Sequence, residues 1–198
     1  MFYDPRANDH GLPLDPFKAL VTPRPIGWIS SLSPGGVANL APYSFFNAIS
    51  EHPHYVVYGS GGRKHSVENI EATREFAVNL ATHDLREQMN LSSATVAADV
   101  DEFELTGLEK AACRFIKPPR VAASPVCLEC VLHQVVPLPD DQGHADDFAV
   151  IGRIVGIHID DRFIKEGRVD TAAMQPIARL GYSEYATVTE AWRMRRPD

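Results

Sequence analysis

The chain has 198 residues, of which 44% are hydrophobic and 23% charged, with a formal net charge of −7 at pH 7. Such a chain can bury one substantial core, and we expect a single domain over residues 1–198. The acidic balance argues against a nucleic-acid-binding protein, because neutralising many phosphates requires an excess of Lys and Arg. No leader-like segment is visible and no apolar run approaches the roughly 20 residues that span a bilayer. We therefore expect a cytoplasmic protein with no membrane partner.

Strand patterns outnumber helix patterns along the chain. Runs rich in β-branched and aromatic residues predict six strands, at residues 26–32, 37–46, 55–60, 75–81, 127–138 and 148–160. Residues 33–36, Ser-Pro-Gly-Gly, form a typical hairpin turn between the first two, and 139–147 predicts a solvated turn between the last two. Short helices are predicted from Ser66 to about Arg74 and over residues 83–91.

This order of elements predicts a mainly β (α+β) fold. The two helices are too short and too irregularly interleaved with strands to support a doubly wound α/β sheet. A closed or nearly closed antiparallel barrel with short helical insertions fits better. Pro42 lies inside the predicted strand 37–46, and because proline cannot donate to a strand ladder it predicts a sheet edge or a bulge. Unpaired backbone groups there suit a flat heterocycle, and a solvent-facing bulge explains the proline equally well.

The three cysteines give no disulfide framework, because their number is odd and no export signal accompanies them. Cys127 and Cys130 form a C-x-x-C spacing that in other settings holds a metal or a redox pair. Here both fall within a predicted strand, where positions three apart point to opposite faces. We therefore expect two partly buried strand cysteines and no metal site.

The stretch GGRKHSVENI, residues 61–70, combines two glycines, two cations and the start of a helix. The glycines permit a tight turn with exposed amides, and Arg63 and Lys64 add fixed positive charge. Ser66 is a candidate N-cap. Since a helix N-terminus offers unpaired N–H groups and partial positive charge, this turn is suited to hold a phosphate. A solvated basic turn explains the same residues, and the glycine spacing of a Walker loop or a dinucleotide fingerprint is absent.

Eight stretches occur in a particular order and approximate spacing along nearly the whole chain. They are TPRPIGWISS (22–31), VANLAPYSFFNAIS (37–50), EHP (51–53), GGRKHSVENI (61–70), EFAVNLA (75–81), LECVLHQVV (128–136), FAVIGRIVGIHIDD (148–161) and ARLGYSEYA (178–186). Each is weak alone, but together they resemble the flavin reductase-like family of FMN-binding split β-barrels. One departure is visible: the family often has an acid and then Thr after the lysine, where this chain has His65 and Ser66.

The resemblance implies a split β-barrel that forms a homodimer, with one noncovalently bound FMN per subunit near the interface. The segment 60–66 is then expected to meet the phosphate, and the segment 39–47 the ring. By position, the implied cofactor-binding residues are Ser30, Ser31, Ser44, Phe45, Asn47, Ser60, Arg63, Lys64 and Ser66. No acid–base residue is implied, because the flavin carries the hydride chemistry.

The activity implied by the resemblance is that of an NAD(P)H-dependent flavin reductase. NADH or NADPH is a transient co-substrate, and free flavin, oxygen or another acceptor receives the electrons. A monooxygenase or another electron-transfer protein is an implied partner. Two alternatives stay open: an FMN-containing electron carrier without nicotinamide activity, and an FMN barrel that oxidises a phosphorylated amine, as pyridoxamine phosphate oxidases do.

Overall fold

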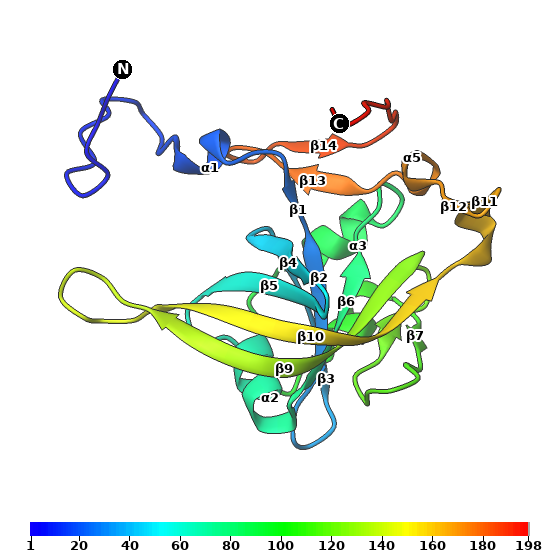
Figure 1. Ribbon diagram of the computed structural model, residues 1–198. Helices are drawn as coiled ribbons and strands as arrows, with labels where there is room; N and C mark the ends of the chain where they lie inside the picture. The colour runs from blue at the N-terminus through cyan, green and yellow to red at the C-terminus, as the bar shows by residue number, and fades with distance from the viewer. Residues whose placement is uncertain (198) are drawn as a thin grey trace.

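The computed structural model describes residues 1–197 and is dominated by one antiparallel sheet (Figure 1). Its seven strands follow the order β3-β2-β6-β9-β10-β5-β4. They are β2 (Gly27–Leu32), β3 (Ala38–Tyr43), β4 (Phe46–Glu51), β5 (His54–Gly61), β6 (Glu75–Leu80), β9 (Val126–Leu138) and β10 (Asp147–Ile159). All six predicted strands are confirmed within this sheet. The seventh, β4, was not separated from β3 by the sequence pattern.

The sheet curls on itself, as its strand order requires. The two edge strands, β3 and β4, are separated along the chain only by Ser44 and Phe45. In a flat sheet, seven strands would place these edges about 29 Å apart, whereas a two-residue link spans only about 11 Å. The sheet therefore closes into a split barrel. Beside the link, Gly59 N of β5 donates a hydrogen bond to the carbonyl oxygen of Phe45 at 2.7 Å, which continues the β4–β5 ladder by one residue.

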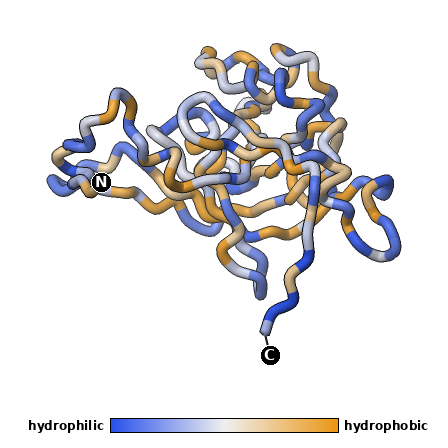
Figure 2. Tube along the Cα trace, turned by 90° about the horizontal axis from the view of Figure 1, so that it is seen from above, coloured by the Kyte–Doolittle hydropathy of each residue, from blue (hydrophilic) through white to orange (hydrophobic). Residues whose placement is uncertain are grey.

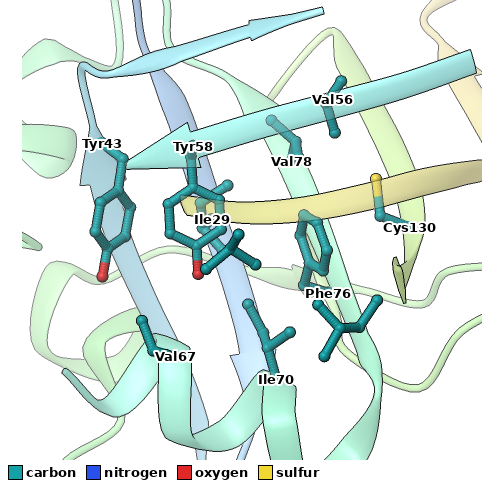
Figure 3. Close-up of a cluster of buried hydrophobic side chains, with 11 residues drawn as sticks. Ile29, Tyr43, Val56, Tyr58, Val67, Ile70, Phe76, Val78 and Cys130 are labelled. Atoms are coloured by element: carbon teal, nitrogen blue, oxygen red, sulfur yellow. The ribbon is translucent and has the colours of Figure 1, made fainter. Parts of the chain in front are cut away.

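The barrel interior holds a hydrophobic cluster that α2 (His65–Thr73) closes at one end. The rings of Tyr58 and Phe76 lie above Val67 and Ile70 of this helix (Figure 3). All four side chains are almost completely buried. The apolar face of α2 therefore fixes the helix, and with it the turn 61–64 that precedes it.

A second cluster lies on the outer side of β2 and β3, under two short helices. These are α3 (Arg86–Leu91), within the predicted helix 83–91, and α4 (Glu102–Thr106). Trp28 is buried in this cluster with Phe103. The indole N–H of Trp28 donates to Ser92 Oγ at 2.9 Å, which ties the segment after α3 to the barrel.

Short elements decorate the barrel, and our sequence patterns predicted none of them. They are α1 (Phe17–Leu20), β7 (Lys110–Ala111), β8 (Arg120–Val121), η1 (Asp161–Phe163), β11 (Ile164–Lys165), β12 (Arg168–Val169) and α5 (Thr171–Met174). A three-stranded sheet of β1 (Arg24–Pro25), β13 (Ile177–Arg179) and β14 (Tyr185–Thr187) completes the fold. Beyond it the C-terminal residues extend away from the body (Figure 2). None of the helices within residues 1–197 has the length and apolar character needed to cross a membrane.

Cys127 and Cys130 lie on opposite sides of β9, as their spacing predicts. Cys130 packs into the barrel interior. Cys127 packs on the outer side with Ala77 and Ile116. Both cysteines are fully buried, and they belong to separate hydrophobic clusters.

Candidate functional site at the barrel seam

A cleft of about 780 Å³ opens beside the Ser44–Phe45 link, where the two edges of the sheet approach each other. This volume is within the usual range of small-molecule sites. Its walls come from the end of β3, the end of β5, the turn into α2, and the segment 92–96. The lining comprises Lys18, Asn39, Ala41, Pro42, Tyr43, Ser44, Phe45, Gly59, Ser60, Gly61, Arg63, Lys64, His65, Ser66, Glu68, Ser92, Ser93, Ala94, Thr95, Val96, Glu102, Leu138, Asp147 and Phe148.

The structure brings six of the nine expected cofactor-binding residues to this cleft. They are Ser44, Phe45, Ser60, Arg63, Lys64 and Ser66. Ser44 and Phe45 form the link between β3 and β4, and the other four lie at the end of the neighbouring strand β5, in the turn into α2 and in the first turn of that helix. The basic turn and the proline-containing strand therefore border one cavity.

Ser30, Ser31 and Asn47 do not line the cleft. Ser30 is fully buried, and its hydroxyl donates to the carbonyl oxygen of Pro119. Ser31 is also fully buried, beside the Asn39 side chain. Asn47 lies on the exposed strand β4 and accepts a hydrogen bond from Ala48 N at 2.9 Å. These three side chains therefore lie outside the lining of this cleft, and their assignment to the cofactor stays a prediction.

The turn 61–64 places the N-terminus of α2 at the cleft. Gly62 has φ of +89°, a left-handed conformation that favours glycine. The helix begins at His65 with Lys64 at its N-cap, and no side chain of the described residues caps its first N–H groups. Ser66 is therefore not the N-cap, contrary to our prediction. It lies inside the first turn and donates its hydroxyl to Asn39 Oδ1 at 2.7 Å. The backbone N–H groups of His65 and Ser66, which have no acceptor within residues 1–197, can therefore donate to an anion.

Two cations of this turn line the cleft, and only one of them is paired with a carboxylate among the described residues. The guanidinium of Arg63 pairs with the Glu71 carboxylate and lies over the Phe148 ring, 5.0 Å from its centroid. Lys64 is exposed, and within residues 1–197 no carboxylate lies at salt-bridge distance from its ammonium. Lys64 is thus the uncompensated positive charge of the turn, while Arg63 is held in place by packing and pairing.

Tyr43 was not among the expected contacts, and its buried hydroxyl lies at the end of the cleft that the basic turn borders. The hydroxyl is buried and has no hydrogen-bond partner among the described residues. It lies beside the hydroxyls of Ser60 and Ser66, which donate to Gly62 O at 2.9 Å and to Asn39 Oδ1 at 2.7 Å. Burial raises the pKa of Tyr43, so the phenol is a neutral donor. A buried hydroxyl without a partner costs about 1–3 kcal/mol, which an acceptor on a ligand would recover.

A buried carboxylate fixes the floor of the cleft. Glu102 is only 3% exposed and accepts hydrogen bonds from Asn39 Nδ2 at 2.7 Å and Leu40 N at 3.1 Å. Burial is the main cause that raises the pKa of Glu102, and these hydrogen bonds oppose it. Since Asn39 Oδ1 in turn accepts from Ser66, Glu102 sets the orientation of a hydroxyl that faces the basic turn.

The opposite end of the cleft offers apolar surface and unpaired backbone. Pro42 lies on the edge strand β3, which confirms the predicted sheet edge. Within residues 1–197, β3 pairs with β2 alone, so its other backbone edge is unpaired, and residues 41–43 of this strand line the cleft. Phe45 is 45% exposed, and an added Cβ on Gly59 would lie 3.2 Å from its Cβ. Backbone donors and acceptors beside an aromatic side chain suit a flat heterocycle.

The basic turn, the buried phenol of Tyr43 and the apolar end thus fit a phosphorylated flat ligand such as FMN. Lys64, Arg63 and the first N–H groups of α2 supply the positive potential for a phosphate, with Ser60, Ser66 and Tyr43 as neutral donors. No group of three or more potential metal ligands gathers within residues 1–197.

Comparison with known proteins identifies a family of flavin proteins. The family model for the flavin reductase like domain matches residues 20–174. An uncharacterized protein from Aquifex aeolicus is 34% identical over 172 residues, which cover 84% of this chain and 85% of that protein.

Crystal structures agree over nearly the full chain. Nitrilotriacetate monooxygenase component B from Bacillus cereus superposes with a TM-score of 0.88 at 27% identity, covering 98% of both chains. The 2-nitrobenzoate 2-nitroreductase NbaA from Pseudomonas fluorescens gives 0.81 at 30% identity, covering 91% of this chain and 88% of that one. A protein of Shewanella frigidimarina, described as a flavin reductase with split barrel domain, gives 0.83 at 24% identity, covering 98% and 94%. The chain therefore belongs to the flavin reductase-like family and has its split-barrel fold.

Proposed function

We propose that this protein binds FMN noncovalently in the seam cleft and acts as an NAD(P)H-dependent flavin reductase, with NADH or NADPH as a transient co-substrate. The observation that carries the proposal is the meeting, in one cavity, of an uncapped cationic turn with the exposed backbone edge of β3. Family membership supports flavin chemistry in general. The phosphate end distinguishes a flavin mononucleotide from unphosphorylated riboflavin.

Each end of the cleft has its own task. Lys64, Arg63 and the N-terminus of α2 hold the phosphate, and hydrogen bonds to such a charged group contribute about 1.5–3 kcal/mol each. The backbone of residues 42–45 meets the polar edge of the ring, and Phe45 covers it from water. Bound FMN supplies the acceptance and release of a hydride, and the chain orients the ring for it. The protein therefore needs no acid–base pair of its own.

The recipient of the electrons is proposed to be free flavin, oxygen or a partner monooxygenase. The monooxygenase partner is supported by the likeness to nitrilotriacetate monooxygenase component B over 98% of both chains. Because NbaA is a 2-nitrobenzoate 2-nitroreductase, a nitrobenzoate belongs among the acceptors to be assayed.

We also propose that the protein is a homodimer with the flavin near the interface. Strand β4 is an unpaired edge whose residues after Phe46 are all exposed. A second groove, of about 510 Å³, lies against it and is lined by Ile49, Ile154 and Ile157. An exposed apolar edge strand favours pairing with another chain. In a symmetric dimer of this chain, each copy covers the β4 groove of the other.

The decisive experiment is anaerobic mixing of the FMN-loaded protein with NADH or with NADPH while flavin absorbance is recorded. Prompt bleaching with either nucleotide supports the reductase. No bleaching with either nucleotide, combined with bleaching by a reduced ferredoxin, would replace the proposal with the electron carrier. Turnover of pyridoxamine phosphate in air would instead indicate the amine oxidase.

Before that experiment, the visible spectrum of the purified protein is recorded, and the chromophore that denaturation releases is identified. A colourless protein that does not take up added FMN would contradict the binding proposal before any activity is measured. Release of riboflavin or FAD would contradict the assignment of the turn to a terminal phosphate.

A further inference from the structure

A pair of cysteine side chains lies outside the cleft, on the outer wall of the barrel. Cys113 follows β7 in the loop 112–119 and packs against Cys127 of β9, beside Ala77 and Ile116. Both side chains thus belong to one small cluster on the outer side of β9. This pair is not the C-x-x-C spacing seen in the sequence, because Cys130 lies in the barrel interior. The fold has thus paired Cys127 with a cysteine 14 positions earlier.

The two thiols differ in exposure. Cys113 is half-buried, whereas Cys127 is fully buried. The neighbouring thiol of Cys127 lowers the pKa of Cys113, which favours its reactive thiolate form. An oxidant from solvent therefore reaches and oxidises Cys113 first.

The loop around Cys113 is held against the barrel wall by hydrogen bonds. The Glu129 carboxylate accepts from Arg114 N at 2.8 Å and from Phe115 N at 2.6 Å. Further along, Lys117 N donates to Glu75 Oε2 at 2.9 Å. These contacts keep Cys113 over Cys127. A disulfide needs an S–S distance of about 2.05 Å, and the movement that closes it is made by Cys113, which lies in a loop outside the strands.

We propose that Cys113 and Cys127 form an oxidation-sensitive pair that a hydroperoxide, such as hydrogen peroxide, converts into an intramolecular disulfide. The sulfur of Cys113 attacks one peroxide oxygen, so that an S–O bond forms, the O–O bond breaks, and the leaving hydroxide takes up a proton as water. The sulfur of Cys127 then attacks the sulfenic sulfur of Cys113. The S–S bond forms, the S–O bond breaks, and the hydroxide leaves with the Cys127 proton as a second water. In total the thiols lose two electrons and two protons, and the peroxide is reduced to two waters.

The test treats the pre-reduced, purified protein with a small molar excess of hydrogen peroxide, removes the peroxide with catalase, and counts thiols after denaturation. The thiol count is expected to fall from three to one, with a mass loss of two hydrogen atoms and a cross-linked peptide joining residues 113 and 127. A reductant is expected to restore all three thiols. The peroxide is added directly, so the result does not depend on flavin binding or on the proposed activity.

Matched variants separate this pair from oxidation in general. Cys130→Ser removes the third cysteine, which is equally buried but on the other side of β9, and is expected to leave the cross-link intact. Cys113→Ser is expected to keep both remaining thiols reduced. Cys127→Ser, checked for folding by circular dichroism, is expected to trap Cys113 with one added oxygen that dimedone captures.

Three outcomes would overturn the proposal. They are persistence of three thiols in the native protein under conditions that oxidise a surface thiol standard, a cross-link that survives Cys113→Ser, and disulfides found only between two chains.

Discussion

Lys64 is a cation that the described part of the fold leaves without a carboxylate, at the mouth of a helix N-terminus. Its charge is therefore available to a ligand. We predict that Lys64→Ala raises the dissociation constant for FMN at least tenfold, because one charge-assisted hydrogen bond of about 1.5–3 kcal/mol is lost. Quenching of flavin fluorescence measures this constant. The melting temperature of the flavin-free variant is expected to stay unchanged, since the side chain is exposed.

The control for Lys64 is Lys117→Ala, which removes the same charge from an exposed position outside the cleft. An equal loss of affinity in both variants would show a net-charge effect rather than a phosphate contact. The double change Arg63→Ala with Lys64→Ala is expected to weaken binding further than Lys64→Ala alone.

Tyr43 allows a prediction in which stability and binding move in opposite directions. Tyr43→Phe removes a buried hydroxyl that has no partner among the described residues. The free energy of unfolding of the flavin-free protein, measured in urea, is expected to stay equal or to rise by up to about 1 kcal/mol. The dissociation constant for FMN is expected to rise severalfold, because the ligand loses a donor. Unchanged FMN affinity would place the hydroxyl outside the binding site.

Glu102, at the floor of the cleft, makes the stability of the folded protein depend on pH. Burial raises its pKa above the ordinary 4.5, so the folded protein holds this proton more tightly than the unfolded chain does. The stability that this group contributes is therefore fully present below the ordinary pKa and declines as pH rises through the raised one.

We predict that Glu102→Gln abolishes that decline, so that the stability of the variant relative to the native protein increases with pH. Urea unfolding of both flavin-free proteins at a series of pH values from about 4 to 7 measures the difference. Parallel pH profiles would contradict the raised pKa. The other titrating groups are common to both proteins and cancel in the comparison.

The sequence alone predicted the charged and turn residues of the candidate site but not its buried residues. Arg63 and Lys64 are recognisable because glycines and cations cluster in the chain. Tyr43 and Glu102 are not, because their importance arises from burial and from partners that are distant in sequence. Ser30 and Ser31 were assigned by position, and only the packing of β2 shows that their hydroxyls are covered.

In the long strand β10, Gly152 lets the backbone pass close to the Phe76 ring. The ladder between β9 and β10 shifts register next to Gly152, and an added Cβ there would lie 2.3 Å from the Phe76 ring. We predict that Gly152→Ala lowers the free energy of unfolding by about 1–3 kcal/mol, because Phe76 is fully buried and has no room to move. Gly35→Ala is the control, since its added Cβ meets only the Ser33 hydroxyl oxygen at 3.7 Å. A similar loss in both variants would attribute the effect to general glycine replacement.

Sequence patterns predicted the long elements and missed the short ones for a physical reason. Strands such as β9 carry continuous β-branched and apolar residues, which are favourable in any sheet. Two-residue strands such as β7 (Lys110–Ala111) exist only because a distant partner lies alongside. The start of α2 was misplaced by one residue because Ser66 uses its hydroxyl on Asn39 of another strand rather than on its own helix.

The whole molecule presents β4 and its apolar groove as the surface proposed for a second copy. We predict that sedimentation equilibrium finds a dimer and that Ile49→Lys, at a side chain 52% exposed on β4, raises the dimer dissociation constant tenfold or more. Leu105→Lys is the control, because that side chain is 42% exposed on α4 and lies outside both the seam cleft and the β4 groove. A monomeric native protein, or equal weakening by both changes, would contradict the proposed interface.

The direct connection between the outermost strands makes the strand order cyclic, and this has a consequence for how such barrels diversify. Residues inserted between positions 44 and 45 would break no ladder pairing, because all ladders lie in the strands on either side. Each added residue would let the two edges part by up to about 3.5 Å. The length of this link thereby sets the width of the cleft, so that insertions here let the family bind larger ligands without a change in the barrel core.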